Sequence, residues 1–187
     1  MYTLNAANHF CLDLGGFSII FESNLSKHKV IKVGFDFPKD PYKDYINICK
    51  KYPNISGFPV IYKTGIINNF YYVVMEKLFI LNNTVEIEKL CKGFAKSVIC
   101  KSKKQKLYNL TEAASILAEK ENKPDYASWD LCSINFMQRK NGEIVLVDPW
   151  CTSFYTIETE AGLTSNMLDH IHDEIVENSA HISRWLK

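Results

Sequence analysis

The spacing of apolar residues predicts β-strands in the first part of the chain. Residues 10–22 contain two short apolar runs separated by Gly15-Gly16, which is typical of a β-hairpin. Residues 29–35 alternate between apolar and polar positions, as a strand with one buried face does. Two further strands are predicted over residues 60–63 and 70–78, joined through Gly65 and Asn68-Asn69. Together these segments predict an antiparallel sheet of five strands.

Helical spacing dominates after residue 80, with one short helix before it. In residues 44–52 the apolar side chains recur at helical spacing. A helix is expected to begin at Thr84, and the strongest helix is expected over residues 110–122 with Thr111 as its cap. A final amphipathic helix is expected over residues 165–186. The prediction is an α+β fold with a β-rich lobe over residues 1–80 and a helical lobe over residues 81–187.

Composition places the chain among ordinary globular proteins, with 47% hydrophobic and 23% charged residues. No apolar run approaches the roughly 20 residues of a membrane helix, and the first residues do not have the pattern of a signal peptide. The six cysteines form no C-x-x-C pair, so reduced thiols are expected rather than disulfides. These features predict a cytoplasmic protein that does not interact with a membrane.

Charge is unevenly distributed although the net charge is only +1. Residues 89–106 hold seven lysines and no acid, which is typical of a solvated surface. Residues 141–183 hold eight acids and no lysine or arginine. An anionic surface attracts basic partners rather than nucleic acid. The sequence therefore predicts a protein partner with basic segments, and it does not define the oligomeric state.

The residues that carry candidate chemistry are spread along the chain in a definite order. Gly15-Gly16 lies in a turn, Lys32 lies on a strand, and Asp130, Asn135 and Asp148 follow much later. Phosphoryl transfer uses this inventory: a glycine turn close to phosphates, a fixed cation, a carboxylate base, and an Asn and an Asp on Mg²⁺. Taken singly, each residue also has an ordinary structural use in a turn or a strand. Their combined order favours a site for ATP and Mg²⁺.

The motifs around these residues resemble those of protein kinases. Three sequences carry the resemblance: V-I-K ending at Lys32, D-L-x-x-x-N from Asp130 to Asn135, and V-L-V-D ending at Asp148. The strand Y-Y-V-V-M-E-K-L resembles a kinase hinge, and G-G-F-S resembles a shortened glycine loop. The resemblance implies a two-lobed kinase fold, in which the four side chains converge around ATP between the lobes.

The resemblance also implies a role for each matched residue. Asp130 would be the catalytic base, Lys32 would bind the α- and β-phosphates, and Asn135 and Asp148 would hold Mg²⁺. Phosphates would lie nearest to Gly15, Gly16 and Ser18. Met75 would be the gatekeeper beside adenine, and the main chain of Glu76 and Leu78 would bind the base. Asp44, or failing that Asp40, is the acid expected nearest to Lys32.

Residues 9–155 resemble the early serine/threonine kinase of short-tailed coliphages in the order of their motifs and in the residues that form them. This similarity implies phosphorylation of host proteins in the host cytoplasm. Some positions depart from the kinase pattern: Ser128 and Trp129 replace the His-Arg before the catalytic Asp, and Pro149-Trp150 replaces Phe-Gly after the metal Asp. These departures leave two alternatives open, a pseudokinase that inhibits a host protein by binding it and a small-molecule phosphotransferase.

Overall fold

The structure of the chain is a computed structural model that describes residues 9–14, 18–23, 26–67, 69–82, 84–101, 107–121 and 123–152. These residues form two compact units. The first contains the described residues up to Lys39 together with Ile61–Lys77, and the second contains Asp40–Val60 and the described residues from Leu78 onwards. The second unit thus includes a segment that precedes the predicted boundary at residue 80, and that boundary stays a prediction. The helix predicted over residues 165–186 lies outside the described residues.

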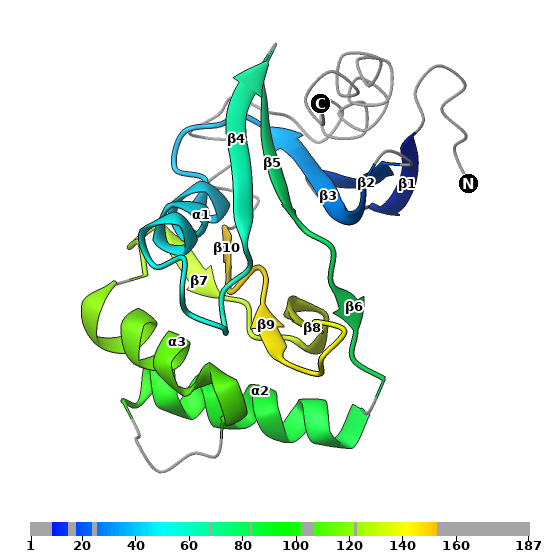
Figure 1. The fold of residues 1–187 in the computed structure, drawn as a ribbon. Helices are drawn as coiled ribbons and strands as arrows, with labels where there is room; N and C mark the ends of the chain where they lie inside the picture. The colour runs from blue at the N-terminus through cyan, green and yellow to red at the C-terminus, as the bar shows by residue number, and fades with distance from the viewer. Residues whose placement is uncertain are drawn as a thin grey trace. The chain divides into compact units, whose positions relative to one another are not determined.

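The first unit is built on one five-stranded antiparallel sheet, as the sequence predicted. Its strands are β1 (His9–Leu14), β2 (Ser18–Ser23), β3 (Ser26–Phe35), β4 (Ile61–Ile67) and β5 (Phe70–Glu76). Their order in the sheet is β1-β2-β3-β5-β4, with β3 in the centre (Figure 1). The mixed α and β composition with antiparallel sheets is confirmed.

Alternation along the strands produces one continuous apolar face. Buried side chains of β2, β3 and β5 lie on it, and each is at most 6% exposed: Ile19, Phe21, Ile31, Val33, Tyr72 and Val74. Gly65, predicted to lie in the connection before β5, is instead inside β4, where a Cβ on residue 65 would lie only 2.6 Å from the Tyr72 ring. The turn itself contains Asn69, whose positive φ of 67° suits asparagine.

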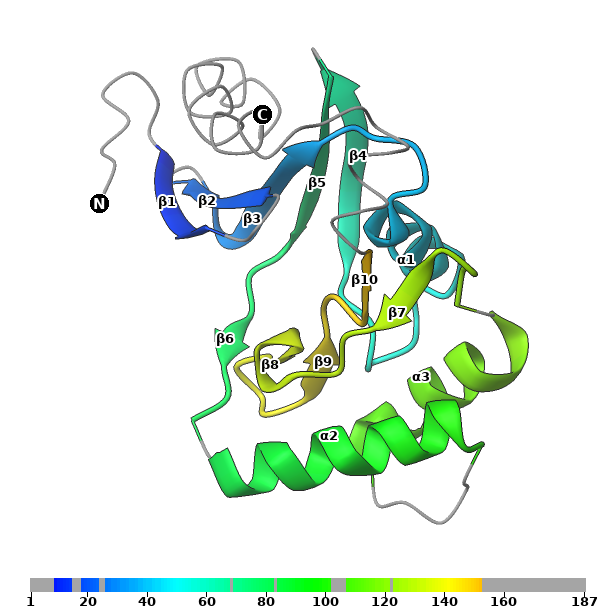
Figure 2. The same ribbon diagram turned by 180° about the vertical axis from the view of Figure 1, so that it is seen from behind.

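The second unit combines helices with two small antiparallel sheets. Its helices are α1 (Pro41–Lys51), α2 (Thr84–Ile99), η1 (Tyr108–Leu110), α3 (Thr111–Ser115), η2 (Ile116–Lys120) and η3 (Ser133–Asn135). Its strands are β6 (Phe79–Ile80), β7 (Ala127–Trp129), β8 (Phe136–Gln138), β9 (Ile144–Leu146) and β10 (Trp150–Thr152). The sheets have the orders β6-β8-β9 and β10-β7. Figures 1 and 2 show α2 and α3 on the same side of the β8–β9 hairpin.

Two helices differ from the sequence prediction in their details. Helix α1 begins earlier than predicted because Asp40 caps it, with the Tyr42 N–H donating to its carboxylate over 2.9 Å and Pro41 at the first turn. In place of the helix predicted over 110–122, residues 108–120 form a 3₁₀ turn, a short α-helix and a π-helix. Thr111 does not cap it; its hydroxyl donates to the Tyr108 carbonyl. None of the helices in the described ranges is long and apolar enough to span a bilayer.

Tyr45 of α1 lies at the centre of the second unit. It is fully buried, and its ring makes edge contacts with Phe58 and Trp150 at centroid distances of 6.0 and 5.9 Å. Its hydroxyl donates to the carbonyl of Leu146 in β9. Desolvation raises the pKa of Tyr45 well above its usual value, with smaller contributions from Cys49 and Asp148. The phenol therefore stays protonated and keeps its donor role across the physiological range.

Replacing Tyr45 by Phe should lower the free energy of unfolding by about 1–3 kcal/mol, because the Leu146 carbonyl would lose its buried donor. Equilibrium denaturation measures the change. Tyr62→Phe is the matched control, since Tyr62 is 48% exposed and its loss should cost less than about 0.5 kcal/mol. Equal stabilities of the two variants would contradict the assigned bond.

Candidate functional site

Three of the predicted site residues lie on one face of the five-stranded sheet. Paired residues of neighbouring strands share a face, and Lys32 pairs with Ile20 of β2 and Val73 of β5. By the same register and the alternation of side chains, Ser18 and Met75 lie on the face of Lys32. Lys32 is half-buried, and Met75 is 6% exposed. The sheet therefore brings together the side chains predicted to meet phosphate and adenine, while Gly15 and Gly16 lie outside the described residues.

The end of β5 has a defined main-chain orientation. Pairs in an antiparallel ladder alternate between those that exchange hydrogen bonds and those that do not. The Lys77 N–H donates to the His28 carbonyl over 2.9 Å, so the adjacent pair, Lys29 and Glu76, does not exchange bonds. The main-chain groups of Glu76 therefore point away from β3, on the side where pairing with β4 ends at Met75. The role of Glu76 in binding a nucleotide base stays a prediction.

The same face carries an ion pair that the sequence motifs did not indicate. The Lys77 ammonium lies against the Glu22 carboxylate, and both side chains are about three-quarters buried. Glu22 lies one row along the sheet from Lys32. The acids predicted to approach Lys32 have contacts in the second unit: Asp44 accepts a hydrogen bond from the Tyr126 hydroxyl, and Asp40 caps α1. Leu78, the other predicted hinge residue, is 9% exposed. It belongs to the second unit and is the first residue of that unit after Val60.

The loop from Asp130 to Asn135 is closed by its own hydrogen bonds. The Asn135 side chain is buried, and its Nδ2 donates to the Asp130 carbonyl over 2.8 Å and to Cys132 Sγ over 3.3 Å. The Asn135 N–H donates to the Cys132 carbonyl over 3.2 Å. The amide nitrogen is thus committed to holding the loop. The amide oxygen is the atom of Asn135 that suits a hard cation.

Asp148 is fixed by hydrogen bonds on each side of it. The Val147 N–H donates to the Asn135 carbonyl over 2.9 Å, and the Asp130 N–H donates to the Pro149 carbonyl over 2.8 Å. The residue before Asp148 is thereby tied to Asn135, and the residue after it is tied to Asp130. We call these two bonds the Asp148 clamp. These bonds bring the main chains of Asp130, Asn135 and Asp148 together.

The two sequence departures next to this loop lie opposite each other in one sheet. Trp129 pairs with Trp150 in the β7–β10 ladder, and their rings meet edge to face with centroids 6.0 Å apart. Trp150 is 3% exposed and also contacts the Tyr45 ring. The residues that replace the kinase arginine and the mobile Phe-Gly pair therefore pack against each other. This packing fixes the segment that leaves Asp148.

The charges around the loop affect two cysteines. The pKa of Cys132 is raised to about 11, first by desolvation of the sulfur and then by a hydrogen bond to Asp130 and the negative charge of that residue. The pKa of Cys151 is raised by desolvation and then by the charges of Asp130 and Asp148. Both carboxylates therefore lie close to one thiol. Cys132 is exposed, but its high pKa keeps the thiolate scarce and disfavours oxidation of this thiol.

The oxygen donors of the loop suit magnesium. Mg²⁺ prefers oxygen ligands, keeps several waters, and is held by one or two protein groups together with substrate phosphates. The Asn135 amide oxygen and the Asp148 carboxylate provide that minimal set, and the clamp holds their main chains together. Within the described ranges, no cluster of three His, Cys, Asp or Glu side chains forms a larger metal site. Asn135 and Asp148 fit the ion by the chemistry of their oxygen atoms, and their role as its ligands stays a prediction.

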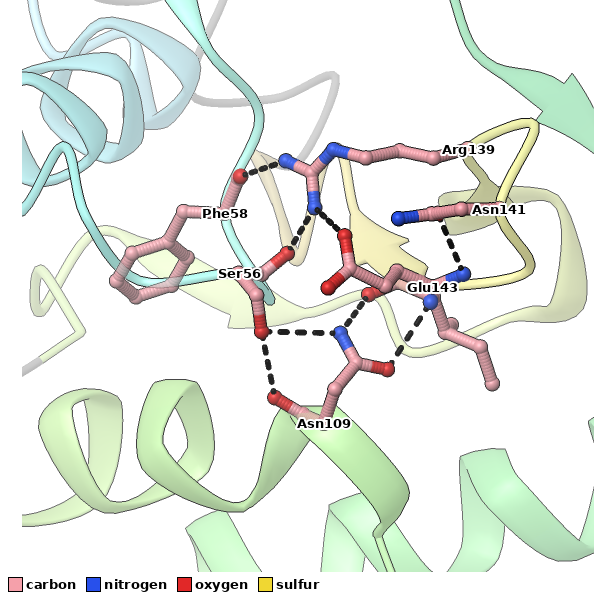
Figure 3. Close-up of polar contacts among 7 residues, drawn as sticks. Ser56, Phe58, Asn109, Arg139, Asn141 and Glu143 are labelled. Atoms are coloured by element: carbon pink, nitrogen blue, oxygen red, sulfur yellow. Dashed lines mark hydrogen bonds and ion pairs between the residues drawn. The ribbon is translucent and has the colours of Figure 1, made fainter.

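The β8–β9 hairpin between Asn135 and Asp148 is held from outside by residues that the motifs did not indicate (Figure 3). The Arg139 guanidinium donates to the carbonyls of Ser56 and Phe58 and pairs with Glu143 over 3.3 Å. The Asn109 side chain donates to the Ile144 carbonyl over 2.7 Å and accepts from the Ile144 N–H over 3.0 Å.

Gly57 completes this support. Its carbonyl accepts from the Leu146 N–H over 3.0 Å. A Cβ at Gly57 would lie 2.8 Å from the Ala113 Cβ, so only glycine allows this close approach without a shift. Asn109, Gly57 and Tyr45 together bond all four outward-facing main-chain groups of β9, at Ile144 and Leu146. Short sequence motifs do not predict such contacts, because the contacts join segments that are far apart in the sequence.

Comparison with known families tests the resemblance that these motifs indicate. A family model described as bacteriophage T7 protein kinase 0.7 matches residues 2–185, nearly the whole chain. The chain belongs to this family. The resemblance identified from the motifs is thereby confirmed, and membership of a phage protein-kinase family supports a phosphotransferase with ATP as its implied substrate. A comparison with curated proteins gave no match. The roles of individual residues stay predictions.

Labelling of Cys132 tests the geometry of the loop without any activity assay. With a pKa of about 11, its alkylation rate should rise about tenfold per pH unit between pH 8 and 10. Asp130→Asn removes the carboxylate charge, so the pKa of Cys132 should fall and its labelling at pH 8 should be several-fold faster. Peptide mass spectrometry measures each site, with exposed Cys100 as the internal control. An unchanged Cys132 rate in the variant would refute the Asp130–Cys132 contact.

Asn109→Asp should destabilise the hairpin support by about 1–3 kcal/mol, because a carboxylate cannot donate to the Ile144 carbonyl. Denaturant titration followed by tryptophan fluorescence measures the loss. Asn54→Asp, at an exposed position, is the matched change and should alter stability by less than about 0.5 kcal/mol. The support is not as described if both variants unfold at the same denaturant concentration.

Proposed function

We propose that the chain is an ATP- and Mg²⁺-dependent serine/threonine protein kinase with a minimal two-lobed kinase fold. The observation that carries this proposal is the Asp148 clamp, which holds a candidate base and two candidate metal ligands together. In kinase chemistry the base accepts the hydroxyl proton, and the cation neutralises charge on the transferred phosphoryl group. Family membership supports the same reaction class.

Each residue has one role in this proposal. Asp130 orients the substrate hydroxyl and accepts its proton, and its position is set by the bond between its N–H and Pro149. Asn135 and Asp148 hold Mg²⁺, which supplies charge neutralisation at the phosphates when bound. Lys32 binds the α- and β-phosphates as a cation fixed in the central strand of its sheet. The glycine turn at Gly15 and Gly16 approaches the phosphates with Ser18.

The nucleotide base binds to the end of β5 in this proposal. Met75 lies on the Lys32 face and borders adenine, and the Glu76 main chain is turned away from β3. The main chain of Leu78 provides the second bond to the base. The rings of Trp129 and Trp150 pack against each other. In this proposal their contact holds Pro149 and Trp150 in place, so that phosphorylation is not needed to order these two residues.

The proposed substrates are proteins of the bacterial host, and the proposed location is the host cytoplasm. Basic substrate segments are proposed because residues 141–183 carry eight acids and no lysine or arginine. A pseudokinase would share the fold and family but would transfer no phosphate. The bonds that hold Asp130, Asn135 and Asp148 favour the active enzyme.

Asp130→Asn should reduce phosphoryl transfer on the order of 10²–10⁴-fold, because a positioned base contributes about that much. The assay follows radiolabelled phosphate from ATP into a basic protein and into the chain itself. Asp125→Asn, an exposed aspartate of the same unit, is the matched control and should retain full activity. Unchanged transfer by Asp130→Asn would exclude the role. An unmodified chain that binds ATP with Mg²⁺ but never transfers phosphate would be a pseudokinase.

A further inference from the structure

The catalytic loop presents one large apolar side chain to solvent. Ile134 is 78% exposed, the highest value among the large hydrophobic residues that the structure describes. Single exposed apolar residues are common on protein surfaces and have no meaning by themselves. The position of Ile134 is what distinguishes it, because it lies between the candidate base and the candidate metal ligand.

The fold of the loop does not require an isoleucine at this position. The loop is closed by the side chain and N–H of Asn135, which bond to Asp130 and Cys132. Asn135 is turned inward and is 7% exposed, whereas its neighbour Ile134 is turned outward. A polar residue at position 134 would leave every one of these bonds intact. The isoleucine therefore contributes little to the packing of the described residues.

The exposed residues that directly precede Ile134 in the chain are of uncharged types. They are Cys132 and Ser133. An exposed apolar side chain favours an apolar side chain of a partner over a charged one, since a charge would lose hydration against it without gaining a counter-ion.

The distance from the base limits which partner residue can reach Ile134. Ile134 lies four positions after Asp130 in the chain, so their Cα atoms lie less than about 14 Å apart even if the chain were fully extended. An extended peptide advances about 3.3 Å per residue. A substrate whose hydroxyl meets Asp130 therefore brings Ile134 within reach of a side chain no more than about four residues from the phosphoacceptor.

We propose that Ile134 is a specificity-determining residue that selects an apolar side chain within four residues of the phosphoacceptor serine or threonine. This inference rests on the proposed kinase function. It adds an apolar requirement at one substrate position to the basic character proposed for the segment as a whole. Ile134 touches the substrate but takes no part in the proton transfer or in metal binding.

The experiment uses the full chain, ATP with Mg²⁺, and a peptide library that has one fixed serine or threonine and each flanking position varied. We expect the unmodified chain to prefer an apolar residue at one flanking position. Ile134→Ser should lower kcat/KM for the preferred peptide about tenfold or more, which is the usual discrimination from one apolar contact. The loss should appear in KM with kcat nearly unchanged, because the contact exists equally in the ground and transition states.

Two controls separate specificity from damage. Peptides with alanine at the selected position should react equally with Ile134→Ser and with the unmodified chain. Ile66→Ser, a similar change at a residue of β4 that is 58% exposed, should keep the apolar preference. The inference alone is overturned if the unmodified chain transfers phosphate without an apolar preference, or if Ile134→Ser retains it. Absence of any transfer by the unmodified chain overturns the proposed function and this inference with it.

Discussion

The candidate chemistry of the second unit depends on two main-chain hydrogen bonds on either side of Asp148. One joins Val147 to Asn135, and the other joins Pro149 to Asp130. Main-chain bonds hold the backbone whatever rotamers the side chains adopt, so the spacing of the three oxygen-bearing residues is set before any ligand arrives. Preorganised groups spare the reaction the cost of assembling them. The surrounding elements mainly protect this geometry.

Protection comes from aromatic packing on one side and from polar support on the other. Trp150 follows the clamp in the chain, and its ring packs against the rings of Trp129 and Tyr45. The hairpin that enters the clamp is held by Arg139 and Asn109, which bond to main-chain groups distant in sequence. In this way α1 and the turn after it belong to the same compact unit as the loop from Asp130 to Asn135. The two tryptophans that depart from the kinase pattern, at positions 129 and 150, thus pack against each other.

The features that could be predicted from the sequence are those that depend on the pattern of neighbouring residues. Alternation revealed the strands of the first sheet, and the D-L-x-x-x-N and V-L-V-D spacings identified the residues of the clamp. Interactions between distant segments could not be predicted this way. Gly65 was expected in a turn, yet its bare backbone in β4 makes room for Tyr72. The segment over 110–122 has strong helix formers, but it includes a π-helical turn that no propensity signals.

The four outward-facing main-chain groups of β9 have partners that are not strands. Tyr45, Asn109 and Gly57 occupy the positions that a further strand would take. Without these partners, the unpaired main-chain groups could pair with another polypeptide, which commonly leads to aggregation. The same residues that steady the site thus close that edge. The β9 edge of this three-stranded sheet is therefore blocked against pairing with a further strand, although β9 has no charged residue and no proline.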